Sequence, residues 1–119
     1  VYDRVLKPIA LEYRPDLVLV SAGFDIYVKD PLGGMQVTGA GFGALASIMR
    51  DIAERTCGGK VLFTLEGGYN PEGLREGVRA VLKAMTGPLK TVPIPSTHKA
   101  ERIIQAIISH QKKYWKSLQ

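Results

Sequence analysis

Two short apolar runs constrain the fold of this 119-residue chain more than any other feature. One reads "DLVLVSAG" from Asp16, and the other reads "VLFTL" over 61–65. Continuous runs of this kind, rich in β-branched residues and bounded by turn signals, are typical of strands buried on both faces of a parallel sheet. Between them, apolar residues recur every three to four positions from 38 to about 55, which predicts an amphipathic helix. Strand, helix and strand indicate an α/β fold built on one right-handed crossover.

Cap and turn residues predict where the helices begin and end. Thr38 is suited to cap the helix between the strands, and "CGGK" at 57–60 predicts the turn that follows it. After the second strand, Asn70 suits a cap position, Pro71 suits a first helical position, and Gly87 predicts the end of that helix. The sequence therefore predicts a second helix directly after the second strand.

Two further helices are expected at the ends of the chain. One lies within 1–13 and is closed by Pro15. The other lies at 98–118, after a connector that contains prolines at 88, 93 and 95. Two strands do not complete a parallel sheet, because strands this apolar need neighbouring strands and helices on both faces. The chain also begins at Val1, without a methionine, so we expect it to be a piece of a longer domain.

Composition excludes several classes of protein. Hydrophobic residues make up 45% and charged residues 23%, as in soluble globular proteins, and no apolar run approaches the roughly 20 residues of a membrane span. The one cysteine, Cys57, excludes an internal disulfide and is expected to be an ordinary turn residue. No secretion signal is evident, so a reducing compartment, the cytoplasm, is expected.

The net charge of +5 is concentrated in 88–119, which contains six Lys or Arg residues and a single acidic residue, Glu101. A basic surface can bind nucleic acid, but no nucleic-acid-binding motif accompanies this one. We therefore expect a solvated helix face, and no membrane or nucleic-acid partner. A role of the last helix in a homo-oligomer stays open.

Both predicted strands end in unusual loops. Asp25 follows the first in "SAGFD", and Tyr69 follows the second in "LEGGYN". Ligands gather at the carboxyl ends of parallel strands, so the two side chains are expected on one rim. A carboxylate and a phenol there suggest a metal site with an oxyanion-stabilising donor. The alternatives are that Asp25 caps a turn or helix, and that Tyr69 is a packed aromatic residue.

The stretch "LVLVSAGFD", then "DPLGG", then "LEGGYN" resembles the C-terminal part of the zinc-dependent histone deacetylase-like amidohydrolases. That family includes acetoin-utilisation proteins and acetylpolyamine amidohydrolases. The resemblance covers roughly residues 14–86. It implies a partial arginase/deacetylase-like parallel sheet flanked by helices, with the N-terminal half of the domain absent. Residues 1–119 would then be the C-terminal portion of a single domain, and 88–119 its connector and basic C-terminal helix.

The resemblance also implies roles for particular residues. Asp25 would be one of three protein ligands to Zn²⁺. Tyr69 would donate its hydroxyl to the scissile amide's carbonyl oxygen and then to the oxyanion, which a phenol can do because it keeps its proton at neutral pH. Leu32, in "DPLGG", would line a narrow tube for an acyl-lysine-like chain, and Gly67 and Gly68 would keep Cβ atoms out of that tube. A bound cation would compensate the charge of Asp25 at the mouth of a buried strand.

The implied function is a zinc-dependent deacetylase that hydrolyses an acyl-amide, such as acetyl-lysine or acetylpolyamine, by metal-activated water. The family's other zinc ligands come from an Asp-x-His element and its base from a tandem His-His, and neither occurs here. His98 and His110 lie outside the motifs. Since catalytic zinc takes three protein ligands, this chain alone is expected to be inactive without the missing N-terminal half. The alternative is a truncated, non-catalytic partner-binding or scaffold module.

Two further positions carry expectations. Asp30, before Pro31, is expected to accept backbone N–H bonds within its loop. Tyr27 stands where some members of the family have a histidine, "GFDAH" against "GFDIY" here. This change leaves the expected zinc role of Asp25 untouched, and it leaves the substrate subgroup open.

Overall fold

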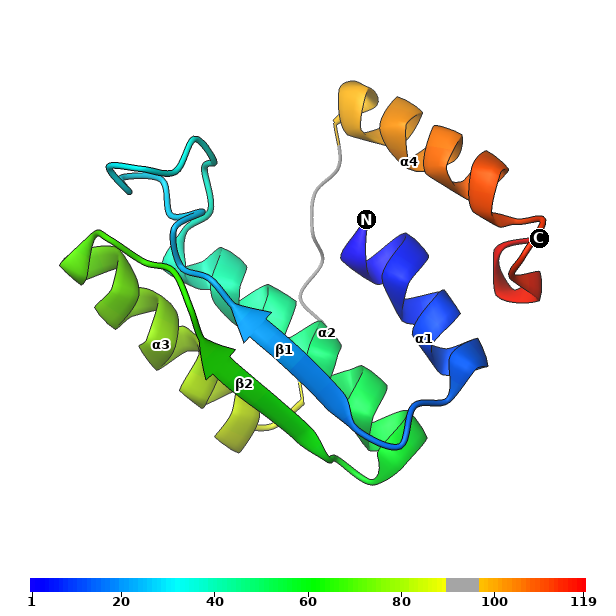
Figure 1. Cartoon of the computed structure of the whole chain (residues 1–119), viewed down its shortest axis with the longest axis horizontal. Coiled ribbons are helices and arrows are strands. Elements are labelled where there is room, and N and C mark those ends of the chain that lie inside the picture. The colour runs from blue at the N-terminus through cyan, green and yellow to red at the C-terminus, as the bar shows by residue number, and fades with distance from the viewer. Residues whose placement is uncertain (90–96) are drawn as a thin grey trace.

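A computed structural model of the chain describes residues 1–89 and 97–119 (Figure 1). Its elements are a π-helix η1 (Tyr2–Leu6), α1 (Lys7–Tyr13), β1 (Val18–Ala22), α2 (Gly39–Cys57), β2 (Val61–Leu65), α3 (Pro71–Thr86), α4 (His98–Gln111) and a 3₁₀-helix η2 (Lys116–Leu118). The prolines at 93 and 95 of the predicted connector lie outside the described residues.

The two predicted strands form one parallel pair. β1 and β2 lie side by side in register, from Val18 opposite Val61 to Ala22 opposite Leu65. α2 connects them, as the alternation of strand and helix patterns predicts. The mixed helix and strand architecture with a parallel sheet confirms the predicted α/β class.

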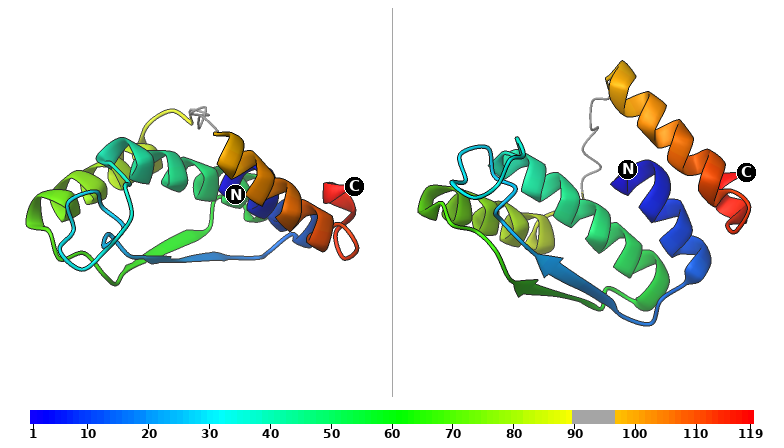
Figure 2. Two further views of the ribbon diagram at one scale, coloured as in Figure 1. Left: turned by 90° about the horizontal axis from the view of Figure 1, so that it is seen from above. Right: turned by 45° about the horizontal axis from the view of Figure 1, so that its top comes forward.

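One face of this sheet is covered by helices (Figure 2). Ile48, Met49 and Ile52 of α2 are buried there, and they pack against Val20 of β1 and Phe63 of β2. Burial of such side chains contributes about 1.5–3 kcal/mol each relative to exposure, so this layer accounts for much of the stability. The apolar stripe predicted for this helix thus faces the sheet.

The opposite face of the sheet is exposed in this chain. Leu19 and Leu62 are direct neighbours across the two strands, and they are 68% and 56% exposed. The expectation that the strands are buried on both faces is therefore wrong for this chain taken alone. No second layer of described residues covers this face, so alternate side chains point to solvent.

A second apolar cluster joins α2, α3 and the loop after β1. Phe24, Tyr27 and Phe42 are buried together, and the rings of Phe24 and Phe42 have centroids 4.9 Å apart. Gly73 and Gly77 of α3 are buried against these rings. The packing is so close that a Cβ at either position would overlap an aromatic side chain. α3 can approach the loop closely only where it lacks side chains.

The predicted helix caps are confirmed. The Thr38 hydroxyl accepts the Gly41 N–H at 3.3 Å at the start of α2. Asn70 Oδ1 accepts the Gly73 N–H at 2.9 Å at the start of α3. α3 begins at Pro71 and ends before Gly87. Such side-chain caps satisfy N–H groups that have no partner within the helix.

Cys57 differs from its prediction as a turn residue. It is the last residue of α2 and is buried, and its thiol contacts the Lys60 carbonyl at 3.3 Å. The turn itself is made by Gly58 and Gly59, both of which have positive φ. The helix therefore runs to Cys57, about two residues further than its apolar pattern indicates.

The predicted helix over 98–118 is shorter in the structure. α4 ends at Gln111, and the chain turns back into η2. Glu12 of α1 accepts the N–H groups of Lys116 at 3.2 Å and Ser117 at 2.7 Å, and the Ser117 bond in particular lowers the pKa of Glu12. This contact holds the segment after α4 against a distant helix, and local periodicity does not report it.

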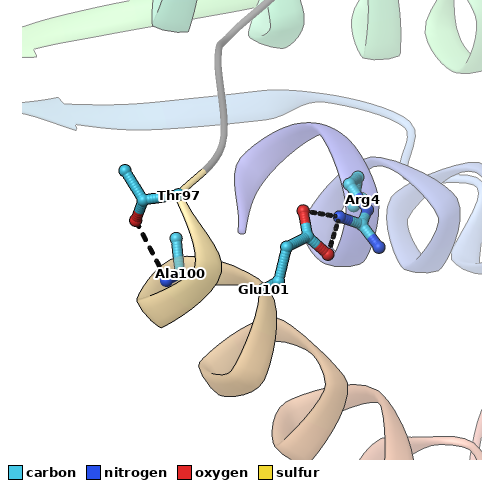
Figure 3. A network of polar contacts seen from close by, with 4 residues as sticks. All are labelled: Arg4, Thr97, Ala100 and Glu101. Carbon is cyan, nitrogen blue, oxygen red and sulfur yellow. Dashed lines mark hydrogen bonds and ion pairs between the residues drawn. The ribbon is translucent and has the colours of Figure 1, made fainter.

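α4 packs against the N-terminal helix η1. Ile104 is buried in this contact, and Arg4 Nη1 lies 2.5 and 2.7 Å from the two carboxylate oxygens of Glu101 (Figure 3). Thr97 caps α4 by accepting the Ala100 N–H at 3.2 Å. Because the ion pair is partly exposed, it contributes at most about 1 kcal/mol, and Ile104 is the stronger anchor. Among the described helices, none has the length and apolarity of a membrane span.

Candidate functional site

The loops after β1 and β2 lie side by side at one edge of the sheet. Hydrogen bonding continues past the strand ends, since the Glu66 N–H donates to the Ala22 carbonyl at 3.2 Å and the Phe24 N–H donates to the Gly67 carbonyl at 2.7 Å. These bonds hold the segment before Asp25 against the segment before Tyr69. The two predicted site residues therefore lie on loops at the same edge, as the topology predicts.

Asp25 occupies a space that two glycines leave open. A Cβ at Gly23 would lie 2.6 Å from Asp25 Oδ1, and one at Gly67 would lie 2.7 Å from the same oxygen. Asp25 is half-buried, and within residues 1–89 and 97–119 its carboxylate has no hydrogen bond or ion pair. It caps no turn or helix in that part of the chain. The strand ends thus hold an ionisable oxygen group that the described side chains do not satisfy.

Tyr69 lies on the adjoining loop with its side chain 57% exposed, so it is not a packed core residue. Its hydroxyl makes no hydrogen bond within the described part of the chain, whereas its backbone N–H donates to Asp30 Oδ2 at 2.8 Å. Gly68, just before it, has φ 141° and contacts Phe24, where a Cβ would lie 2.9 Å from the Phe24 Cβ. The tyrosine is thus held by its backbone, and its phenol is free to contact a ligand.

The resemblance predicts that the two glycines of "EGGYN" border a substrate tube. In the structure, the space left by their missing Cβ atoms is filled by Asp25 at Gly67 and by Phe24 at Gly68. Their immediate effect is that the two loops approach closely. Their contribution to a substrate tube stays a prediction.

Leu32 projects from the loop between β1 and α2 and is 73% exposed. That loop is tied together by the Val28 N–H, which donates to the Val37 carbonyl at 2.9 Å, and by the Val37 N–H, which donates to the Ile26 carbonyl at 3.1 Å. An exposed leucine on an anchored loop can contact an apolar chain without refolding. Its role in substrate binding stays a prediction.

Asp30 is the one buried charged side chain among the described residues. Its Oδ1 accepts the N–H groups of Leu32 at 2.9 Å and Gly33 at 3.0 Å, and its Oδ2 accepts those of Tyr69 at 2.8 Å and Asn70 at 3.2 Å. Burial alone raises the pKa of Asp30, but these four donors outweigh it and hold the pKa below its ordinary value. The predicted acceptor role is confirmed, and it extends to a second loop that the sequence did not indicate.

Tyr27 has a structural position that the sequence analysis missed. It is 4% exposed, and its hydroxyl donates to Glu76 Oε2 at 3.3 Å. Burial, together with the carboxylates of Glu76 and Glu72, raises the pKa of Tyr27. The spacing of Gly73 and Gly77 on α3, four residues apart, is the signal that an aromatic group packs there.

The described residues do not form a complete metal centre. Within 1–89 and 97–119, no group of three or more His, Cys, Asp or Glu side chains could hold a metal ion. His98 and His110 lie on α4, which packs on η1 and stands apart from the loop after β1 in Figures 1 and 2. Asp25 is therefore a candidate for one ligand of a site whose other ligands come from elsewhere.

Comparison with known proteins agrees with this arrangement. A model of the histone deacetylase domain matches residues 1–85. Histone deacetylase 10 of Oryza sativa, a chloroplastic protein, is 44% identical over 86 residues, which cover 72% of this chain and 19% of the relative. Polyamine deacetylase HDAC10 of Homo sapiens is 40% identical over 118 residues, which cover 97% of this chain and 17% of the relative.

A solved structure extends the agreement to three dimensions. The crystal structure of the HDA15 HD domain superposes with a TM-score of 0.81 at 36% identity, over 98% of this chain and 31% of that one. The chain spans about a fifth of the length of the curated relatives that it matches. With a family model over most of its length and a matching solved fold, this chain carries part of the α/β deacetylase fold and belongs to the histone deacetylase family.

Proposed function

We propose that this chain supplies part of the active site of a zinc-dependent deacetylase, which hydrolyses an acyl-amide by metal-activated water in the intact protein. The observation that carries the proposal is the Asp25 carboxylate, which lies between two glycines without a partner among the described residues, at the same sheet edge as the Tyr69 loop. A carboxylate oxygen is an accepted zinc ligand, and an unpartnered one fits that role.

The residues of this chain have distinct tasks in the proposed reaction. Asp25 would hold Zn²⁺ together with ligands from outside the described residues. When bound, the metal would polarise the amide carbonyl and lower the pKa of water. The Tyr69 hydroxyl donates a hydrogen bond to the carbonyl oxygen of the substrate. This hydrogen bond persists and stabilises the negative charge that develops on that oxygen during the reaction. Leu32 contacts the aliphatic part of the acylated chain.

We further propose that the chain is the C-terminal portion of a single deacetylase domain and is inactive alone. Its exposed sheet face supports this, because Leu19 and Leu62 would be buried if further strands and helices completed the fold. The share of the relatives that it covers supports it as well. The N-terminal half would then supply the remaining metal ligands and the general base.

The substrate class is an acylated amine. Relatives carry the names histone deacetylase and polyamine deacetylase, so both an acetyl-lysine peptide and an acetylated polyamine are substrates to test. For the compartment we propose the cytoplasm, supported by the single, buried Cys57. Cell fractionation tests this directly, since two of the relatives are chloroplastic.

The test compares the isolated chain with the intact protein that contains it. Both are assayed with an acetyl-lysine peptide and with an acetylated polyamine, before and after chelation and with zinc added back. The proposal expects turnover by the intact protein, loss on chelation, recovery with zinc, and no turnover by the chain alone. Turnover by the pure chain, or turnover unaffected by chelation, would contradict it.

The exposed apolar face also favours a second candidate, a non-catalytic module that binds a partner. Leu17, Leu19 and Leu62 are each at least half exposed, and patches of this kind mark interaction surfaces. Mixing the chain with the remainder of the parent domain separates the two candidates. Recovered deacetylation supports the enzyme, whereas binding without activity supports the module. Light scattering of the chain alone would show whether the occupant is a second copy.

A further inference from the structure

The carboxylate of Asp30 divides its hydrogen bonds between two loops. Oδ1 accepts the N–H groups of Leu32 and Gly33 in its own loop, and Oδ2 accepts those of Tyr69 and Asn70 in the loop after β2. All four bonds are 2.8–3.2 Å long, and Asp30 is 8% exposed. We refer to these four bonds as the Asp30 bridge.

The Asp30 bridge restrains the backbone at Tyr69, just past the hydrogen bonds that join the two loops at Ala22 and Gly67. Gly67 and Gly68 precede Tyr69, and glycines allow the backbone many conformations. The Tyr69 side chain is largely exposed, and its hydroxyl has no partner among the described residues. The contact from Asp30 to the Tyr69 N–H therefore restricts the direction in which the phenol leaves the loop.

A second contact strengthens the connection between the loops. Asn70 Nδ2 donates to the Lys29 carbonyl at 2.9 Å, while Asn70 Oδ1 caps α3 through the Gly73 N–H. The loop after β1 is thereby joined to the loop after β2 and to the first turn of α3. A displacement of either loop would break several hydrogen bonds at once.

We propose that Asp30 is a positioning residue that sets the Tyr69 hydroxyl and the Leu32 side chain relative to each other. The inference rests on the proposed function, because it assigns Tyr69 the oxyanion-stabilising role. Asp30 touches neither substrate nor metal and acts through the backbone of the two loops. Its effect on turnover should therefore depend on the presence of the Tyr69 hydroxyl.

The kinetic test uses Asp30→Asn in the intact protein. An amide has one acceptor oxygen, so two of the four N–H groups lose their acceptor and face an NH₂ group instead. Misplacing a catalytic group by about 1 Å can cost about 10²-fold, so kcat should fall by about that factor. Asp51→Asn is the matched control, because Asp51 lies on α2, is paired with Lys7 of α1 at 2.8 Å and, among the described residues, has no hydrogen bond or ion pair to either loop. That control should keep kcat.

A double-mutant cycle separates positioning from general destabilisation. If Asp30 acts through the phenol, adding Asp30→Asn to Tyr69→Phe should slow the enzyme by no more than about threefold beyond Tyr69→Phe alone. The proposal would be overturned if Asp30→Asn lowered kcat by the same factor with and without the Tyr69 hydroxyl. An unchanged kcat in Asp30→Asn alone would overturn it as well. The pattern expected for positioning is thus a strong effect that disappears without the hydroxyl.

An exchange measurement decides the matter if Asp30→Asn does not fold. In the unmodified intact protein, the amides of Tyr69 and Asn70 should exchange with solvent at least tenfold more slowly than that of Met35, since a hydrogen-bonded N–H is protected. Met35 is an exposed loop residue whose N–H has no acceptor in the described part of the chain. Equal exchange rates would refute the Asp30 bridge. An intact protein without deacetylase activity would refute the proposed function instead, and the exchange result would still stand.

Discussion

The carboxylate of Asp25 lies against Gly67, and a Cβ on that glycine would come within 2.7 Å of Oδ1 and 2.9 Å of Cγ. Asp25, on the loop after β1, supplies the candidate metal-binding oxygen, and Gly67, on the loop after β2, leaves the space that this oxygen occupies. The contact joins the two sequence motifs directly, across more than 40 positions of chain.

Gly67→Ala should therefore displace the Asp25 carboxylate. We expect the zinc affinity of the intact protein to fall about 10–100-fold, as for other changes that reorient a metal ligand. Gly34→Ala is the matched control, since a Cβ there would meet no atom within 4 Å. Competition with a zinc-binding dye measures both variants. Unchanged zinc affinity in Gly67→Ala would count against Asp25 as a ligand.

Tyr69→Phe should reduce kcat of the intact protein by about 10²–10³-fold, the usual cost of one oxyanion donor. Stability should not change, because the hydroxyl is bonded to no other described residue and the ring is mostly exposed. Steady-state kinetics and thermal unfolding test the two parts. A large fall in melting temperature would indicate a structural role for the tyrosine.

The Asp30 bridge should make stability depend on pH in a specific direction. The pKa of Asp30 is lowered in the fold, so its stabilising effect is complete above the unfolded value of about 3.9 and is lost as pH falls through the folded value. The difference in unfolding free energy between the unmodified protein and Asp30→Asn should be constant near neutral pH. It should shrink below about pH 3.9, which urea unfolding measures. A difference that grows on acidification would contradict the assignment.

Gly77→Ala should destabilise the fold by about 1–3 kcal/mol, although alanine is the better helix former. The new methyl group would overlap the Phe24 ring and lie 3.1 Å from Phe42. Gly43→Ala on α2 is the control, because its Cβ would make ordinary contact with Ala80 at 3.5 Å. That variant should be neutral or up to about 1 kcal/mol more stable. Thermal or urea unfolding should therefore show a loss of stability for Gly77→Ala and no loss, or a small gain, for Gly43→Ala.

Leu19→Ala should have different effects in the isolated chain and in the intact protein. Leu19 is 68% exposed in this chain, so the change should alter its unfolding free energy by less than about 0.5 kcal/mol. If the rest of the domain covers this sheet face, the same change should cost the intact protein about 2–5 kcal/mol. Equal, small effects in both would show that the face stays exposed.

The sequence alone predicted the elements that depend on local chemistry. β-branched runs, a helical apolar period, and the caps Thr38 and Asn70 act over a few residues, so their signal is contained in neighbouring positions. The parallel pairing also followed, because a strand–helix–strand unit has essentially one way to close. The parallel topology also placed Asp25 and Tyr69 at one sheet edge, because both follow the carboxyl ends of neighbouring strands. The resemblance of two motifs identified the family.

Tertiary contacts decided the rest, because they join residues that are far apart in the chain. Glu12 accepts N–H groups of Lys116 and Ser117, about 100 positions away and beyond the end of α4, and no local pattern reports that partner. The sequence predicts that Asp30 accepts N–H groups within its own loop, but only the fold brings the Tyr69 N–H to its second carboxylate oxygen. Apolar strands likewise predict burial, but burial depends on what covers them, and in this chain one face of the sheet has no cover among the described residues.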